Sequence, residues 1–485
     1  MGILLPSWKG IGRSPWALKG LRSEVSVRGI SLDPLLRIEP PRRACHHTHV
    51  TANELHARHI VQTLRDHGFV AYFAGGCVRD RLLSLEPKDF DVATNARAEV
   101  VQRLFPSTVP VGIQFGVVLV MDDGTPCEVA TFRSDGLYID GRHPTSVHFG
   151  NAQEDAQRRD FTINGMFYDP LTDDVIDHVG GRDDLRAGVI RAIGDPYARF
   201  AEDRLRMLRA VRLAARLDFA IAPDTFAAIR DLASTIGDIA WERIGDEIVK
   251  IVTGRGAKRA FELLSESHLL TAVLPEIETM RGVAQSPDFH PEGDVFVHTL
   301  LLLANLVQPT ETLALGALLH DVAKPLCQVH NAHRITFYGH CEKGADMAVE
   351  ICQRLKRSRE TWERVAYLVK NHLRLVSAPE MRTATLKRFL REEGFAELLE
   401  LARLDALASS GDLRPYHFCR EQLAALAPEQ IAPPRLLSGH DLMALGIPPG
   451  PRFKEMLSAV EDAQLEGQLH SREEALAWVK GQFGV

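Results

Sequence analysis

The chain of 485 residues has no uninterrupted apolar run that approaches the roughly 20 residues needed to span a bilayer, so the sequence predicts no transmembrane segment. Its seven cysteines are odd in number and scattered, and they form no C-x-x-C pair. This pattern is typical of reduced thiols and predicts a cytoplasmic protein. The chain also lacks an excess of positive charge, because its formal net charge is −7. A generally basic surface for nucleic acid is therefore excluded, whereas local basic faces stay open.

With 45% hydrophobic and 25% charged residues, the chain has an ordinary globular composition and is long enough for several domains. Residues 1–50 stand apart, because they show no sustained periodicity and contain five prolines, with eight Lys or Arg against three Asp or Glu. A targeting arm or an RNA-contacting tail would fit this bias. We favour a disordered extension, or residues upstream of the true start codon.

The stretch from Gly75 to Asp91 begins with a glycine turn. The apolar run at residues 69–73 predicts a strand, after which Gly75 and Gly76 let the backbone approach a ligand closely before a short helix opens. The first turn of such a helix presents free N–H groups to a phosphate. We therefore expect a phosphate-binding turn here.

The same stretch ends in two acidic residues that flank a phenylalanine. On a strand, Asp89 and Asp91 would point to one face while Phe90 points into the core. Two carboxylates a few Å apart repel each other unless a divalent cation lies between them. Next to a phosphate-binding turn, the pair predicts metal-assisted nucleotidyl transfer.

From Gly75 to Thr94, the sequence matches the motif GG-x-VRD-x-LL…KD-x-D-x-x-T residue for residue. It resembles the class II tRNA nucleotidyltransferase and bacterial poly(A) polymerase superfamily. The resemblance implies that Asp89 and Asp91 are catalytic and bind Mg²⁺. It also implies that Gly75, Gly76 and Arg79 position a nucleoside triphosphate.

Two strand-like runs at residues 116–121 and 127–132 follow, joined by an Asp-Asp-Gly turn. Glu128 lies early in the second run and could supply a third carboxylate near the first two, or it could be a rim glutamate. Residues 134–151 contain three glycines and a proline, which predicts a mobile loop over the site.

The run RRDFTING at residues 158–165 adds phosphate-binding chemistry. Two guanidiniums favour bidentate phosphate recognition, and a neighbouring carboxylate and amide can hydrogen-bond ribose hydroxyls. The run is similar to the family's RRDFT-x-N motif. The resemblance implies that Arg159 and Asp160 contact the phosphates and sugar of the incoming nucleotide, with support from Asn164.

A helix is predicted from Arg199 to Leu217, and Asp203 and Arg206 lie at positions i and i+3 within it, so both reach the same neighbour. A carboxylate accepts from an exocyclic amine while a guanidinium donates to ring acceptors, so the pair can mimic the edge of a base. The segment resembles the family's ED-x-x-R element, in which side chains select CTP and ATP.

Residues 241–247 resemble the next family element, which implies support for the neck. Three arginines follow along one side of the helix: Arg209, Arg212 and Arg216.

A second group of candidate ligands falls in separate helical-looking segments. Imidazole and carboxylate together suit a borderline or hard divalent metal, and helices can converge such ligands. Their order resembles the HD phosphohydrolase superfamily, and the two intermediate histidines resemble its two-metal members. The resemblance implies a second divalent metal of unknown identity, while a chance pattern or an HD fold without hydrolysis stays open. The candidate ligands are His298, His320, Asp321, His340, His372 and Asp405.

Basic faces on the later helices could follow an RNA backbone, although solvated helix surface explains them equally well. The segment 428–434 contains three prolines and predicts a linker. Beyond it the chain resembles the terminal segment that holds tRNA in the family. The basic residues are Arg354, Lys356, Arg357, Arg359, Lys387, Arg388 and Arg391.

We therefore predict an α+β protein with a mixed-sheet nucleotidyltransferase head followed by mainly helical parts. The predicted divisions are a head at 51–195, a neck at 196–265, an HD domain at 266–426 and a tail at 435–485. The resemblance implies CCA addition to tRNA from CTP and ATP. A CC-adding or A-adding enzyme, a poly(A) polymerase, an HD phosphohydrolase and an RNA-binding module with a decayed head stay open, as does the oligomeric state.

Overall fold

The computed structural model describes residues 50–122, 124–136, 146–287, 290–331 and 334–484. The predicted N-terminal extension, apart from Val50, lies outside the described residues. The centre of the predicted loop at 134–151 lies outside them as well. None of the helices that the described residues form is long and apolar enough to cross a bilayer.

The head is built on a seven-stranded sheet with the strand order β3-β4-β5-β2-β1-β8-β9. Only the β2–β5 pair is parallel, and the other neighbours are antiparallel, which confirms the mixed sheet. A small antiparallel pair, β6 (Arg133–Asp135) and β7 (Val147–Phe149), stands apart from it. The sheet strands are β1 Ala71–Ala74, β2 Asp91–Thr94, β3 Thr108–Gly112, β4 Val117–Asp122, β5 Thr125–Thr131, β8 Phe167–Asp169 and β9 Asp174–Ile176.

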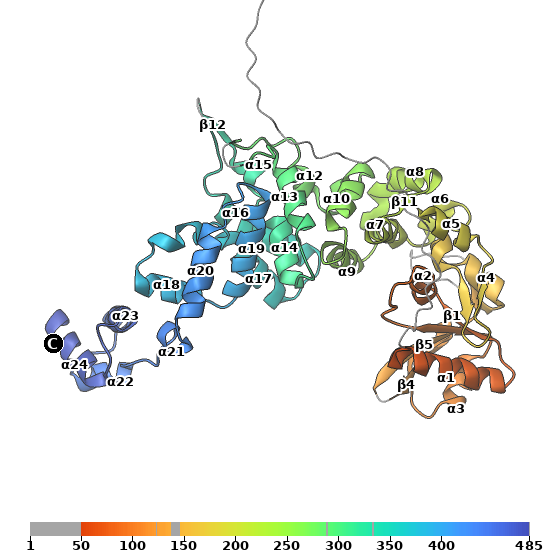
Figure 1. Cartoon of the computed structure of the whole chain (residues 1–485), viewed down its shortest axis with the longest axis horizontal. Helices are drawn as coiled ribbons and strands as arrows, with labels where there is room; N and C mark the ends of the chain where they lie inside the picture. Colours follow the sequence, from red (N-terminus) through yellow and green to blue (C-terminus); the bar gives the residue numbers. More distant parts are fainter. Residues whose placement is uncertain (1–49, 123, 137–145, 288–289, 332–333, 485) are drawn as a thin grey trace, which may run out of the picture. The chain divides into compact units, whose positions relative to one another are not determined.

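Side-chain alternation gives the sheet two different faces. Phe73, Val92 and Val129 belong to the main hydrophobic core with α1 (Ala52–Asp66) and α3 (Ala98–Leu104), which pack on this face (Figure 1). The opposite face carries a smaller cluster: Ala74, Ala93, Phe132, Ala156 and Phe167. Because side chains alternate, Asp91 and Glu128 fall on this second face. They are register partners on the parallel strands β2 and β5.

Helices dominate the chain after the sheet. The predicted helix from Arg199 to Leu217 is wrong in one respect, because the structure has two helices that are interrupted at Asp203. Asp203 has an extended backbone (φ −149°, ψ 103°), which interrupts the helix, and its Oδ1 accepts the N–H of Leu205, the first residue of α7, at 3.1 Å. The helices are α4 Ala152–Gln157, α5 Gly181–Ala187, α6 Pro196–Glu202, α7 Leu205–Leu217, α8 Pro223–Leu232, α9 Trp241–Val252, α10 Ala257–Glu266, α11 Leu269–Val273 and α12 Pro275–Glu278; β10 (Val189–Ile190) pairs with β11 (Ala220–Ile221).

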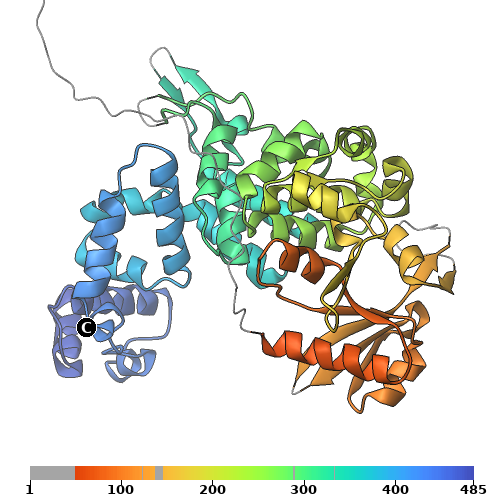
Figure 2. The same ribbon diagram turned by 45° about the vertical axis from the view of Figure 1, so that its right-hand side comes forward.

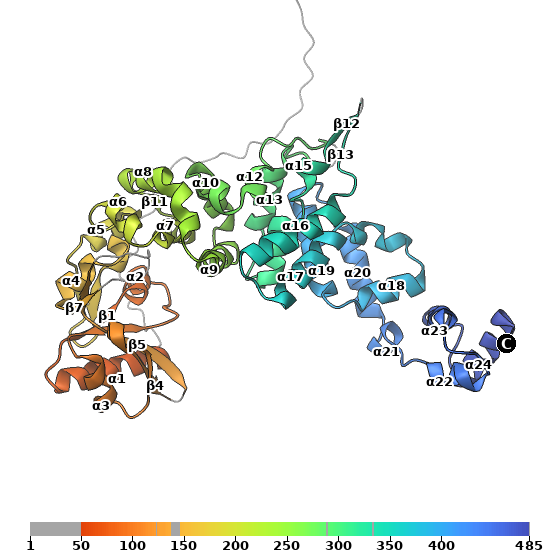
Figure 3. The same cartoon turned by 180° about the vertical axis from the view of Figure 1, so that it is seen from behind.

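The next helices surround α14, which is apolar on all sides and buried from Leu313 to Leu319. Helices α16 and α17 pack side by side, and a hairpin of β12 (Val329–Asn331) and β13 (Arg334–Thr336) precedes them (Figure 3). The helices are α13 Val295–Ala304, α14 Glu311–Leu319, α15 Lys324–Cys327, α16 His340–Arg354, α17 Arg359–Asn371, α18 Thr383–Leu390, α19 Phe395–Ala408 and α20 Arg414–Ala425.

The tail has a hydrophobic cluster of its own that includes Leu442, Met456 and Val479 (Figure 2, dark blue). The segment 428–434, expected as a linker, contains a short helix, α21. The tail helices are α21 Pro428–Ile431, α22 Gly439–Ala444, α23 Pro451–Leu465 and α24 Arg472–Phe483.

Part of the predicted basic face packs against this tail. Arg388 donates to Glu461 at 2.8 Å, Arg391 pairs with the same carboxylate, and Lys387 donates to the Leu465 carbonyl at 2.7 Å. These three side chains therefore bond to acidic and carbonyl groups of α23. The suggestion that they follow an RNA backbone stays a prediction.

Gly245 in α9 marks a close approach between the neck and the end of α16. A Cβ at this position would lie 2.1 Å from the Leu355 carbonyl oxygen. Gly245→Ala should therefore cost about 1–3 kcal/mol of stability through steric overlap, and the melting temperature should fall. Gly237→Ala is the matched control, since nothing lies within 4 Å of a Cβ there. Equal melting temperatures for the two variants would contradict this packing.

Candidate active site and metal cluster

A cavity of about 420 Å³ opens where the glycine turn meets α7. Eight arginines and three aspartates contribute to its lining, so its wall carries an excess of positive charge. Asp89 and Glu128 are not among the lining residues. Nine of the predicted site residues line it: Gly75, Gly76, Arg79, Asp91, Arg159, Asp160, Asn164, Asp203 and Arg206.

Gly75 forms the predicted turn between β1 and α2 (Gly76–Leu82). Its backbone has φ +74° and ψ −133°, a conformation that essentially only glycine adopts. A Cβ here would lie 3.2 Å from Arg159 Nη1 and 3.8 Å from Asp91 Oδ2. The turn thus brings the main chain against a guanidinium on one side and a carboxylate on the other.

Asp91 lies in a region of crowded negative charge. Although Asp91 keeps an exposed side toward the cavity, desolvation by the surrounding protein and then the charges of Glu128 and Asp89 raise the pKa of its carboxyl to about 6, against the effect of Arg159. A divalent cation would relieve this repulsion, so the donor set fits a hard metal ion such as Mg²⁺. The fit rests on charge, since the three carboxylates do not form a tight ligand cluster among the described residues.

The expectation that Asp89 lies on the strand with Asp91 is wrong. Strand β2 begins at Asp91, because β1 ends at Ala74, the register partner of Asp91, and the chain then enters the glycine turn. The alternation itself holds, because Asp89 is exposed while Phe90 is buried and packs edge-on against Phe73 with ring centroids 5.3 Å apart. Asp89 therefore lies in the segment that precedes β2, outside the strand.

Asp155, which sequence reasoning missed, holds both arginines of the RRDFT motif. Its buried carboxylate accepts from Arg158 at 2.7 Å through one oxygen and from Arg159 at 2.9 Å through the other. Although burial opposes the charge, the two guanidiniums keep the pKa of Asp155 below its usual value. The Arg159 guanidinium also lies over the Phe167 ring, 5.2 Å from its centroid.

Asp160 and Asn164 belong to a buried network that joins the head to α7. Asp160 accepts from Asn164 at 3.1 Å and from Arg209 at 2.7 Å, and Asn164 accepts from Arg79 at 2.7 Å. Burial opposes the charge of Asp160, but Arg209 and Asn164 lower its pKa to about 2. A second link runs from Arg216 on α7 to Asp80, at 3.2 Å.

Asp203 and Arg206 are both held in place by other charged groups. Arg243 of α9 donates to Asp203 Oδ2 at 2.8 Å, and Arg206 donates to Glu202 Oε2 at 2.6 Å. Arg243 lies within the segment that the resemblance assigned to neck support. The structure therefore places that segment directly behind one half of the predicted base-reading pair.

Sequence reasoning did not assign five of the lining arginines to the site. Arg209, Arg212 and Arg216 carried a usable signal, since they recur at i, i+3 and i+7 on one face of α7. Arg243 lies in the segment assigned to neck support, and its place beside the cavity was missed because its partner lies 40 residues away. The five are Arg158, Arg209, Arg212, Arg216 and Arg243.

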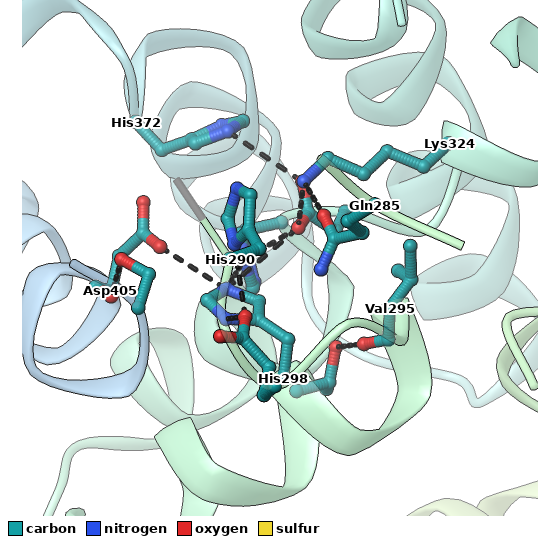
Figure 4. A network of polar contacts seen from close by, with 12 residues as sticks. Gln285, His290, Val295, His298, Lys324, His372 and Asp405 are labelled. Carbon is teal, nitrogen blue, oxygen red and sulfur yellow. Dashed lines mark hydrogen bonds and ion pairs between the residues drawn. The ribbon is translucent and has the colours of Figure 1, made fainter. Parts of the chain in front are cut away.

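The predicted HD residues converge in a second, separate site. His298, His372, Asp405 and the neighbouring Lys324 come from different segments and point toward one centre (Figure 4). His298 Nε2 lies 3.1 Å from Asp405 Oδ1 and 3.2 Å from His320 Nε2. These three side chains form one group whose donor atoms all lie within 4.8 Å of one another.

The other predicted ligands lie beside this group. His320 Nε2 lies 3.1 Å from Asp321 Oδ2, and His340 Nε2 lies 3.4 Å from His372 Nε2. Asp321 Oδ1 faces the second pair, at 3.6 Å from His340 and 3.8 Å from His372. All six predicted ligands are therefore brought together.

The ring orientations of the histidines suit metal binding. Nδ1 of His320, His340 and His372 lies 2.7–2.9 Å from the carbonyl oxygen three residues earlier in each case. A ring nitrogen that donates to such a carbonyl leaves Nε2 as the lone pair that faces inward. His298 Nδ1 lies 2.8 Å from Glu292, a partner that sequence reasoning did not identify.

Asp321 carries a buried acceptor that the protein leaves unused. Its Oδ1 is buried and accepts no hydrogen bond from the described residues, while Lys324 Nζ lies 2.7 Å from its Oδ2. A buried carboxylate oxygen without a donor is costly unless a cation compensates it. Together with the inward-facing imidazoles, it fits a divalent metal.

Comparisons with known proteins agree with this architecture. Family models match a poly A polymerase head domain at residues 71–191, a probable RNA and SrmB-binding site of polymerase A at 218–280 and an HD domain at 296–408. The fold and these matches define the class: a nucleotidyltransferase head of the poly A polymerase type, followed by an RNA-binding region and an HD domain.

Among curated proteins, the CCA-adding enzyme of Geobacillus sp. (strain WCH70) is 32% identical over 86% of this chain and 94% of that protein. The chain therefore belongs to the family of CCA-adding enzymes. The CCA-adding enzymes of Bacillus pumilus and Geobacillus stearothermophilus are 43% and 46% identical over 47% and 44% of this chain. Those two alignments span about half of each relative, at 56% and 53% of its length.

Solved structures give the same answer for the fold. The Bacillus stearothermophilus CCA-adding enzyme in complex with CTP is similar with a TM-score of 0.68 and 29% identity, over 90% of this chain and 98% of that chain. The Thermotoga maritima CCA-adding enzyme complexed with tRNA is similar in fold, with a TM-score of 0.56 and 20% identity over 89% and 95% of the two chains.

Proposed function

We propose that this protein adds the CCA sequence to the 3′ end of tRNA from CTP and ATP, without a nucleic-acid template. One observation carries the proposal: a single arginine-rich cavity brings the glycine turn and Asp91 together with Asp203 and Arg206. The first pair suits a triphosphate and its metal, and the second pair suits a base. A cytoplasmic location belongs to the same proposal, because the scattered cysteines, which are free among the described residues, suit a reducing compartment.

The arginines would bind the triphosphate. Arg159 lies next to Gly75, and a guanidinium has five N–H donors, so it can bind a phosphate while it keeps its bond to Asp155. Arg209 and Arg216 add positive charge from α7. The buried acids that anchor these arginines fix their orientation, which pre-organises the site before the nucleotide arrives.

Asp89 and Asp91 would hold Mg²⁺, and Glu128 is near enough to contribute charge. A divalent ion there supplies Lewis-acid activation of the RNA 3′-hydroxyl and neutralises charge on the departing pyrophosphate. Asp91 lies 3.8 Å from the position of a Cβ on Gly75, so the carboxylate and the turn face the same phosphate.

Asp203 and Arg206 would select the base. Cytosine and adenine both present an exocyclic amine beside a ring acceptor, whereas uracil and guanine present a carbonyl there. A carboxylate accepts from the amine, and a guanidinium donates to the ring. Asp203 accepts two hydrogen bonds from other described residues. A carboxylate can accept about four, so Asp203 can also accept a hydrogen bond from a base.

Three tRNA ends test the activity: tRNA lacking CCA, tRNA ending in C and tRNA ending in CC, each with CTP and ATP separately and together. We expect completion to CCA on all three. Asp89→Asn and Asp91→Asn should lower addition by at least about 100-fold, because the metal loses its ligands. The control, exposed Asp174→Asn, should retain activity. Products that stop at CC, gain only A or extend into an A tail would support the corresponding alternative instead.

Nucleotide choice is tested by removing the partner of the base-reading carboxylate. Arg243→Ala frees Asp203 to move, so misincorporation of UTP and GTP should rise. The total rate of nucleotide addition should fall by a smaller factor than the factor by which misincorporation rises. Asp203→Ala should show the same effect more strongly. Arg259→Ala, which breaks a bond to exposed Asp218, serves as the control. Unchanged selectivity in both test variants would remove the assignment of Asp203.

The HD cluster supports a second activity, hydrolysis of a phosphate ester at an RNA end. The six converging ligands would hold divalent metal, which supplies activation of a water molecule. We expect phosphate release from RNA that ends in a 2′,3′-cyclic or 3′-phosphate, and its loss in His320→Ala. Exposed His440→Ala should keep it. Release that persists in the His320 variant would argue against this site.

A further inference from the structure

A cysteine lies next to the HD cluster without belonging to the predicted ligand set. Cys341 is the second residue of α16, directly after His340, and it is half-buried. Its Sγ lies 3.6 Å from His340 Nε2. Sγ and the Nε2 atoms of His340 and His372 all lie within 4.8 Å of one another.

The spacing of these atoms matches the corners of one coordination tetrahedron. With zinc bond lengths of about 2.3 Å to sulfur and about 2.05 Å to nitrogen, tetrahedral angles place S and N roughly 3.6 Å apart and two N atoms roughly 3.3 Å apart. The observed distances are 3.6 Å for Cys341 to His340 and 3.4 Å for His340 to His372. The third edge, from Cys341 Sγ to His372 Nε2, lies within 4.8 Å, so one ion could contact all three atoms once that edge closes to about the tetrahedral length.

Asp321 lies beside the two histidine corners and is the candidate for the fourth ligand. Its buried Oδ1 lies 3.6 Å from His340 Nε2 and 3.8 Å from His372 Nε2. The same oxygen accepts no hydrogen bond from the described residues, so it lacks the compensation that a buried carboxylate needs. This is a second observation that points to a cation, independent of the cysteine.

The two halves of the HD cluster differ in chemistry. His298, His320 and Asp405 offer only nitrogen and oxygen donors. The half around His340 and His372 adds sulfur. Thiolate ligands favour zinc and other thiophilic ions over Mg²⁺ or Mn²⁺, so the halves should prefer different metals.

We propose that Cys341 is a thiolate ligand of a metal subsite formed with His340, His372 and Asp321, and that this subsite binds a thiophilic divalent ion such as Zn²⁺. Binding forms a metal–sulfur bond and releases the thiol proton to solvent. The proposal extends the HD half of the proposed function and does not depend on CCA addition by the head.

Cobalt spectroscopy tests the proposal without reference to activity. The full-length, metal-free protein is titrated with Co²⁺, and we expect a near-ultraviolet thiolate-to-cobalt charge-transfer band whose intensity at saturation corresponds to one cobalt–thiolate bond per chain. Cys341→Ser should abolish the band and weaken zinc binding at one site more than about 10-fold, since even changes around a ligand cost about 10–100-fold. Cys327→Ser, a half-buried cysteine of α15, is the matched control and should keep the band.

A second measurement uses only the unaltered protein, in case the variant folds poorly. X-ray absorption of the zinc-loaded chain should show one sulfur scatterer at about 2.3 Å. Cobalt binding without a charge-transfer band, a band that survives Cys341→Ser, or a zinc shell of nitrogen and oxygen alone would each overturn the proposal. A failure of CCA addition would leave these signals in place, so the two proposals are tested separately.

Discussion

A buried contact between Asp160 and Arg209 joins the two halves of the nucleotide cavity. Asp160 follows the arginines of the head motif, whereas Arg209 lies on α7, the helix that begins just after Asp203. The ion pair is strong enough to lower the pKa of a buried carboxylate to about 2. Because of this link, the glycine turn with Asp91 and the proposed base-reading pair face one cavity. Removing Arg209 would leave the buried carboxylate of Asp160 without its ion-pair partner, which is destabilising.

The two sites hold charge in different ways. In the head, buried acids hold the arginines in place, so the cavity wall stays positive. Asp91 lines the same cavity, and its surroundings raise the pKa of its carboxyl. In the HD cluster, backbone carbonyls orient the imidazoles of His320, His340 and His372 so that their Nε2 atoms face Asp321. The first arrangement suits an anionic substrate that brings its own metal. The second suits a metal that the protein holds itself.

Much of this could be predicted from the sequence, because the glycine turn, the RRDFT run and the HD pair are contiguous motifs. The mixed sheet and the helical remainder were predicted correctly for the same reason. The rest depends on tertiary contacts. Asp89 lies outside β2 because the strand partner ends at Ala74, and the helix breaks at Asp203 because the backbone is extended there. The roles of Arg243 and Glu292 beside the two sites could not be predicted, since each acts through a partner brought in by the fold.

The most direct test of the account is a crystal of the protein grown with CTP and Mn²⁺, with the anomalous signal recorded at the manganese edge. The account predicts a peak beside Asp91 and Asp89, next to the Gly75 turn, with the triphosphate against Arg159 and the cytosine edge against Asp203 and Arg206. CTP bound elsewhere, or manganese bound in this cavity away from both carboxylates, would contradict it.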